Sequence, residues 1–177
     1  MKQTFFQQVL REHRDRVFSH ALYSLRDRDD AEDVTQEVFL RYWRTDPDVP
    51  DDRIGAWLTR VVHNLCIDHS RRRKTIRAYF GRPDPDAMEH LVATTPDLQT
   101  DQLGHELLTA MQALSPETRS IMLMHYEQGL KLREISELLD ANVNSLKVRI
   151  HRARKTLREV LANPGRPSLA ARGEGGS

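Results

Sequence analysis

A single cysteine, Cys66, occurs among the 177 residues, so the sequence excludes an internal disulfide framework. No run of about 18 apolar residues occurs, which predicts that no segment spans or inserts into a membrane. The first residues also lack the long apolar core of a secretory signal peptide. Together these absences favour a cytoplasmic protein.

The short motifs of common catalytic sites are missing as well. The sequence has no phosphate-binding loop, no Gly-x-Ser-x-Gly nucleophile motif and no His-Glu-x-x-His metal motif. Its carboxylates lie in the first turns of predicted helices, in loops and in a linker, rather than in convergent pairs. We therefore expect neither enzymatic activity nor a small-molecule substrate, and no cofactor is implied.

What the sequence does have is segregated charge, although the formal net charge is only +1. Residues 60 to 77 contain six Lys or Arg and one acid, and residues 142 to 158 contain six Lys or Arg and no acid. Residues 83 to 106 contain six acids and no Lys or Arg. This pattern predicts two basic helical lobes joined by an acidic linker, and local basic patches matter more for nucleic-acid binding than total charge.

The stretch from 144 to 161 is predicted to be an amphipathic helix that Asn144 caps. Its apolar residues recur at the three- and four-residue steps of one buried stripe: Leu146, Ile150, Ala153, Leu157 and Leu161. At about 100° per residue, the opposite side holds Val148, His151, Arg152 and Lys155, flanked by Lys147, Arg149, Arg154 and Arg158. A helix that is apolar on one side and basic on the other is suited to a polyanion.

A shorter amphipathic helix over residues 130 to 139 and a tight turn over 140 to 143 come before it. A short helix, a turn and a basic helix form the helix-turn-helix signature, in which the second helix enters the DNA major groove. The alternative is a surface helix with a solvated basic face. A further helix is predicted over 100 to 113, and Ser115 and Pro116 then start another.

Three more helices are predicted in the first half, over residues 3 to 26, 31 to 44 and 53 to 77, with Asp30 as the cap of the second. In the third, one side is expected to hold Ile54, Trp57, Leu58, Val61, Leu65 and Asp68. Four consecutive basic residues, 71 to 74, exceed what a helix C-terminus needs and indicate a phosphate partner. His63, Cys66 and His69 admit a zinc site as an alternative, although no fourth ligand lies nearby.

Three motifs in this order resemble the extracytoplasmic-function (ECF) group of bacterial RNA polymerase sigma factors, over roughly residues 3 to 161. They are residues 30 to 39 (DAEDVTQEVF), residues 56 to 74 (AWLTRVVHNLCIDHSRRRK), and residues 113 to 117 (ALSPE) together with the helix-turn-helix. The resemblance implies an all-α fold of two small helical domains. Region 2 would occupy 1–80, a flexible acidic linker 81–100, region 4 101–162 and a disordered tail 163–177.

The resemblance also implies a site for each function of such a protein. Core polymerase would bind Asp33, Gln36, Glu37 and Leu40. The melted −10 strand would bind Arg60, Asn64, Asp68, Arg71, Arg72, Arg73 and Lys74. The −35 duplex would bind Lys147, Val148, Arg149, His151, Arg152 and Lys155.

The expected partners are core RNA polymerase, promoter DNA and an anti-sigma factor. Two hypotheses of other classes compete with a sigma factor. One is a stand-alone helix-turn-helix regulator that binds duplex operators, which leaves residues 71 to 74 and the acidic face of the second helix unexplained. The other is a metal-sensing helical protein.

Overall fold

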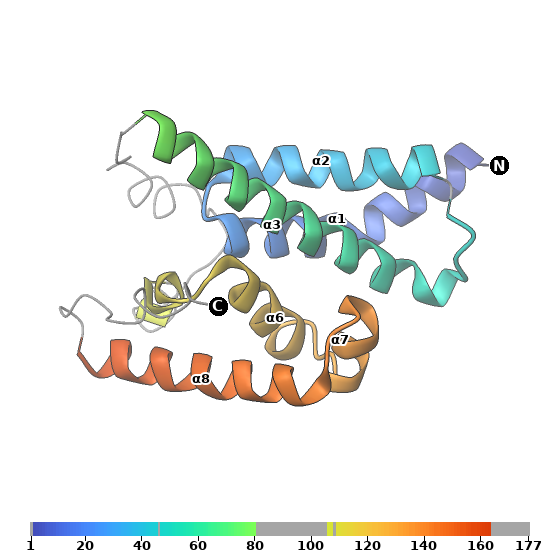
Figure 1. The fold of residues 1–177 in the computed structure, drawn as a ribbon. Coiled ribbons are helices and arrows are strands. Elements are labelled where there is room, and N and C mark those ends of the chain that lie inside the picture. The colour runs from blue at the N-terminus through green and yellow to red at the C-terminus, as the bar shows by residue number, and fades with distance from the viewer. Residues whose placement is uncertain (1, 46, 81–105, 108, 164–177) are drawn as a thin grey trace. The chain divides into compact units, whose positions relative to one another are not determined.

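The computed structural model describes residues 2–45, 47–80, 106–107 and 109–163, and within these ranges the chain contains helices and no strand (Figure 1). The α-helices are α1 (Lys2–Leu25), α2 (Arg28–Thr45), α3 (Ile54–Phe80), α6 (Pro116–Tyr126), α7 (Leu132–Leu139) and α8 (Val143–Ala162), and the 3-10 turns are η1 (Asp51–Arg53) and η3 (Met111–Ala113). The chain divides into two compact units, Met1–Pro96 and Asp97–Ser177. The predicted all-α fold is confirmed.

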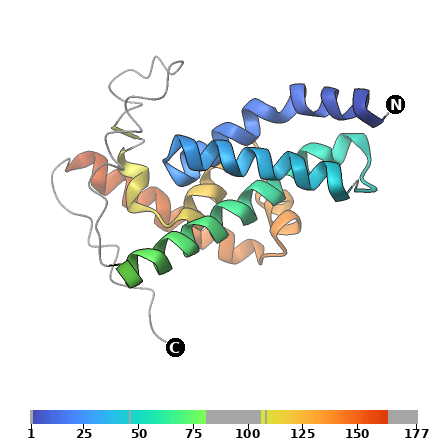
Figure 2. The same ribbon diagram turned by 90° about the horizontal axis from the view of Figure 1, so that it is seen from above.

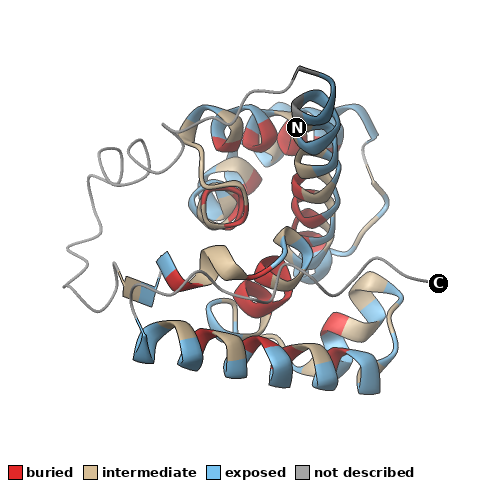
Figure 3. Cartoon of the chain, turned by 60° about the vertical axis from the view of Figure 1, so that its left-hand side comes forward, coloured by how far each residue is buried: buried red, intermediate tan, exposed pale blue. Residues whose placement is uncertain are grey.

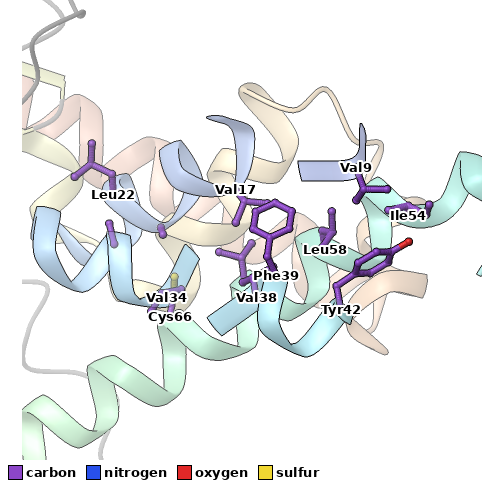
Figure 4. Packing of buried hydrophobic residues seen from close by; sticks show 13 residues of the cluster. Val9, Val17, Leu22, Val34, Val38, Phe39, Tyr42, Ile54, Leu58 and Cys66 are labelled. Carbon is purple, nitrogen blue, oxygen red and sulfur yellow. The ribbon is translucent and has the colours of Figure 1, made fainter. Parts of the chain in front are cut away.

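In the first unit, α1, α2 and α3 lie side by side around one apolar core (Figures 1 and 2). Each helix contributes a stripe, and Figure 4 shows Val17, Val38 and Leu58 meeting from the three helices. Aromatic rings close one part of the core: Tyr42 stacks on Phe6 at 6.4 Å between ring centroids and meets Trp57 edge-on at 5.6 Å. Such pairs add to the stability that apolar burial gives.

The buried face of α3 differs from the predicted one. Ile54, Leu58, Val62 and Cys66 are buried at four-residue steps, whereas Asp68 is exposed. Trp57, Val61 and Leu65 pack partly buried at the edge of the core. The predicted face thus contained Ile54 and Leu58 correctly but missed Val62 and Cys66, whose free thiol packs like a small apolar group.

The start of α2 is also earlier than predicted. Asp27, not Asp30, caps it: an Asp27 carboxylate oxygen accepts a 3.0 Å hydrogen bond from the Asp30 N–H. Arg26 makes the break from α1 in the left-handed conformation, with φ of 61°. Asp30 thus lies in the first turn of α2, where its side chain is available for other contacts.

The second unit contains the helix-turn-helix. Ile135 of α7 is fully buried in a core that it shares with Met124 of α6 and the stripe of α8, and this core is separate from that of the first unit. Ser115 and Pro116 start α6 as predicted, with the Ser115 hydroxyl accepting from the Thr118 N–H at 3.3 Å. Gly129 lies two residues after Glu127, the C-terminal cap of α6, and has a φ of 70°.

The turn into α8 is built by Asp140 and Asn142. Asp140 takes the left-handed conformation, with φ of 52°, which ends α7. The Asn142 side-chain oxygen accepts hydrogen bonds from the N–H groups of Asn144 and Ser145 at 2.8 and 3.3 Å. Asn142 is therefore the cap of α8, and the predicted cap, Asn144, is one of the residues that it caps.

The acidic linker over 81–100 and the tail beyond 163 lie outside the described residues, as does half of the helix predicted over 100 to 113. Among the residues described, no helix is both long enough and apolar enough to cross a membrane.

Candidate nucleic-acid interface

The basic side of α8 is solvent-exposed, as the sequence pattern predicted. Leu146, Ile150, Ala153 and Leu157 are buried, although Leu161, the last residue of the predicted stripe, is 40% exposed. Figure 3 shows buried residues along one side of α8 and exposed residues along the other. The exposed side holds five of the six residues predicted to bind the −35 duplex: Lys147, Val148, His151, Arg152 and Lys155.

Arg149, the sixth, has a partner within the lobe. Its guanidinium lies 2.7 Å from a carboxylate oxygen of Glu117, at the start of α6. Both side chains are partly exposed, so the ion pair contributes little to stability. Because a guanidinium has five N–H donors, Arg149 can hold Glu117 and still donate to a phosphate. Glu117 belongs to the ALSPE motif, but it lies 32 residues from Arg149, so no local pattern indicates that the two are partners.

A second exposed face runs along α3. The residues predicted to bind the −10 strand on this face are exposed and lie within about 160° around the helix axis: Arg60, Asn64, Asp68, Arg71, Arg72 and Lys74. Asp68 lies 4.0 Å from Arg71, a surface pair that leaves most of the positive charge uncompensated. Asn64 is the one uncharged member, and its amide can both donate to and accept from a base edge.

Arg73 departs from this group. Its guanidinium lies 2.7 Å from one carboxylate oxygen of Asp30 and 3.7 Å from one of Asp27. On the other Asp30 oxygen, the His69 ring nitrogen Nε2 lies at 3.4 Å. Burial raises the pKa of Asp30, as do the neighbouring acids, whereas His69 and Arg73 lower it. Arg73 and Asp30 thus connect α3 to the first turn of α2.

The residues predicted to bind polymerase share one face of α2. Asp33, Gln36 and Leu40 are exposed, and Glu37 is half-buried with its carboxylate 2.7 Å from Arg41. Leu40 is a large apolar side chain that is 44% exposed among polar neighbours. A single exposed apolar side chain is ordinary on a protein surface, so Leu40 does not by itself mark this face as a contact.

The three residues considered for zinc do not form a ligand set. Cys66 is fully buried in the apolar core, and His63 is buried as well. His69 faces Asp30. Among the described residues, no three His, Cys, Asp or Glu side chains are grouped so that they could hold a metal ion. The metal-sensor hypothesis therefore has no ligand cluster within this part of the chain.

Family models match both units. The family model described as "Sigma-70 region 2" matches residues 9–76, and the model described as "Sigma-70, region 4" matches residues 104–157. The first match covers α2 and the exposed face of α3 as far as residue 76, and the second covers the helix-turn-helix. The two matches lie in the order that the sequence motifs indicated.

Relatives match along most of the chain. The ECF RNA polymerase sigma factor SigL of Mycobacterium tuberculosis is 32% identical over 158 residues, which cover 87% of this chain and 87% of that protein. SigE of Mycolicibacterium smegmatis is 33% identical over 156 residues, which cover 88% of this chain but only 61% of SigE. The chain belongs to the ECF group of sigma-70 RNA polymerase sigma factors.

Solved structures share the fold. The sigma factor RpoE from Bartonella quintana, in a co-crystal structure with the anti-sigma factor NepR, matches with a TM-score of 0.73 at 21% identity, covering 91% of this chain and 98% of that one. CnrH, solved in complex with the cytosolic domain of CnrY, matches with a TM-score of 0.63 at 24% identity, covering 90% of this chain and 89% of that one.

Proposed function

We propose that this chain binds core RNA polymerase and directs it to promoters, where one lobe binds the −35 duplex and the other binds the melted −10 strand. The observation that carries this proposal is that each lobe has its own core and one exposed basic helix face. A stand-alone operator-binding regulator needs only the second lobe. The exposed face of α3 and the acidic face of α2 would then have no role.

In the second lobe, α8 lies in the major groove of the −35 element. Lys147, Val148, His151 and Arg152 contact base edges, which give sequence preference, whereas Arg149 and Lys155 contact phosphates, which fix the position of the helix. The exposed methyl groups of Val148 suit a thymine methyl group, and Arg152 suits the two acceptors of a guanine.

In the first lobe, α3 binds the unpaired −10 strand. Cations that follow the backbone, together with groups that bind extruded bases, hold single-stranded nucleic acid. Arg60, Arg71, Arg72 and Lys74 supply the cations, and Asn64 contacts a base. Asp68 lies on the same exposed face of α3 as these residues, and its negative charge disfavours a phosphate close to it.

The first lobe also binds polymerase, through Asp33, Gln36, Glu37 and Leu40 of α2. This face and the basic faces would be open to DNA and polymerase whenever the chain is free. An anti-sigma factor that covers them is therefore a further proposed partner, as NepR is for the RpoE of the co-crystal structure. The chain acts by binding, in the cytoplasm, and uses no cofactor.

The test is a binding assay with core RNA polymerase, followed by transcription from a promoter library. We expect the full chain to associate with core enzyme and the holoenzyme to select a pair of elements. Leu40→Asp should abolish the association, because it puts a charge into the apolar part of the contact, whereas Val148→Asp on α8 should leave core binding intact. A wild-type chain that binds duplex DNA alone but never core enzyme would favour the regulator.

A further inference from the structure

Arg73 lies on a different side of α3 from the rest of its basic run. At about 100° per residue, four of the exposed residues proposed to bind the −10 strand fall within an arc of roughly 80°: Arg60, Asn64, Asp68 and Arg71. Arg73 falls roughly 180° from the middle of that arc, in phase with Val62 and Cys66. A side chain in this phase points toward α2 rather than toward a strand that Asn64 contacts.

The apolar core of the first lobe ends before the basic segment of α3 begins. Cys66 is the last buried residue of α3 among those whose side chains are described, so residues 71 to 74 have no buried apolar anchor. The contacts of Arg73 and His69 with Asp30 continue the same stripe, at three- and four-residue steps beyond Cys66. Each of these three side chains is less than a third exposed.

Asp30 is itself fixed in place. It lies in the first turn of α2, its N–H is held by the Asp27 carboxylate, and Ala31 beside it is fully buried. These contacts fix the main chain from which the Asp30 carboxylate extends, and a partly buried charged pair is stronger than one in open water. The ion pair therefore holds the basic segment of α3 against α2 and fixes the rotation of this segment about the α3 axis.

We propose that Arg73 is a positioning residue rather than a DNA contact, and that its ion pair with Asp30 sets the angle at which Asn64 and Arg71 face the −10 strand. This inference rests on the proposed function of α3. It also changes one sequence prediction, because Arg73 was expected to contact DNA. The neighbouring Arg71, Arg72 and Lys74 remain exposed and available for phosphates.

The test uses holoenzyme and two fork-junction DNAs, one carrying the −10 element selected from a library and one with that strand scrambled. All variants are compared at a temperature where circular dichroism shows them fully folded. Arg73→Met and Asp30→Asn should each lower the preference for the selected strand by about tenfold, and the double variant should be no worse than either, because residues that act as one unit are not additive. Arg73→Lys, which keeps the charge, should retain most of the preference.

Salt dependence separates positioning from phosphate contact. Each phosphate contact on a single strand contributes about 0.7 to the slope of log affinity against log salt. Arg73→Met should leave this slope unchanged, whereas the matched control Arg72→Met should lower it by about that amount without changing the strand preference.

Two results would overturn the inference. The first is a lower slope for Arg73→Met with no effect of Asp30→Asn, which would make Arg73 a phosphate contact. The second is full strand preference in both variants, which would leave the ion pair with no role in recognition. Failure of the wild-type chain to bind core enzyme would instead overturn the proposed function.

Discussion

In the proposed complex with the −35 duplex, side chains on α8 divide into those that contact bases and those that contact only the DNA backbone. Arg152 and Lys155 are both exposed and lie three residues apart on the same side of the helix. A planar guanidinium can bind two acceptors of one base at once, whereas a Lys ammonium acts as a compact point charge. This difference in chemistry predicts different losses when each is removed.

We expect Arg152→Ala to weaken binding of the −35 duplex by about 1–3 kcal/mol and to relax sequence preference at one position, the effect of losing a base contact. Lys155→Ala should weaken binding to specific and scrambled duplexes alike and lower the salt slope by about one. Holoenzyme binding to both duplexes over a salt series measures this. Equal losses on both duplexes for Arg152→Ala would make it another phosphate contact.

The buried histidine of α1 makes stability depend on pH. His20 is fully buried, and burial, followed by the charges of His63 and Arg16, lowers its pKa from 6.5 to about 3. Between these values the unfolded chain binds a proton that the folded chain does not. The free energy of unfolding should therefore decrease as pH falls below 6.5, by about 1 kcal/mol per pH unit.

Urea unfolding followed by tryptophan fluorescence checks this prediction, because Trp43 and Trp57, the two tryptophans of the chain, lie in the first unit with His20. His20→Gln should flatten the pH dependence between 6.5 and 5, even if it lowers stability at neutral pH. The matched control, His151→Gln, changes an exposed histidine of the second unit and should leave the dependence unaltered. An equal slope in wild type and His20→Gln would show that another group is responsible.

At the scale of the helix, the start of α8 has two nearby asparagines, Asn142 and Asn144, and only Asn142 caps the helix. Asn142 accepts from two N–H groups of the first turn, whereas Asn144 lies inside that turn. Asn142→Ala should cost about 1 kcal/mol, the usual cost of losing a cap, and Asn144→Ala should cost much less. Circular dichroism of the full chain in urea measures both, and similar losses for the two variants would contradict the assignment of the cap.

The helices could be predicted from sequence because each has one apolar stripe at helical spacing. Their ends were less predictable, since adjacent polar residues compete for the same role. Asn142 and Asn144 can both cap, as can Asp27 and Asp30, and the choice depends on backbone angles that no local pattern fixes. The outcome matters for the proposed positioning role of Arg73, because Asp30 is available for Arg73 only when Asp27 caps α2.

The exposed faces of α8 and α2 were predictable for the same reason as the helices, because the side opposite a buried stripe faces solvent. The ion pairs were not predicted. Arg73 pairs with Asp30 across 43 residues and Arg149 pairs with Glu117 across 32, and local charge patterns contain no information about such partners. The sequence did contain one indication that Arg73 faces α2. Arg73 follows Val62, Cys66 and His69 at four- and three-residue steps, which places it on the same side of the helix as these residues.

At the scale of the whole chain, the two lobes have separate cores and should unfold separately. Ile135→Ala removes a fully buried side chain of the second unit and should cost about 2–5 kcal/mol there. The circular dichroism transition should shift, whereas the tryptophan fluorescence transition should stay in place. Val38→Ala, in the core of the first unit, should shift the fluorescence transition to lower denaturant concentration. Parallel shifts in both signals would show that the lobes unfold as one.

Separate cores also predict separable losses of function. In Ile135→Ala, core polymerase binding should persist because α2 and its supporting helices are untouched, whereas −35 recognition should fall with the folded fraction of the second lobe. Binding to core enzyme and to the −35 duplex, measured on the same preparation, gives the comparison.

The buried position of Cys66 has a practical consequence. The chain's one thiol lies in the interior, where a maleimide dye cannot reach it while the protein is folded. Pairs of surface cysteines, introduced at Arg44 on α2 and Arg158 on α8, would therefore accept donor and acceptor fluorophores without replacement of the native thiol. Energy transfer between them would then report, in real time, any change in the distance between the two dyes when core polymerase is added to the labelled chain.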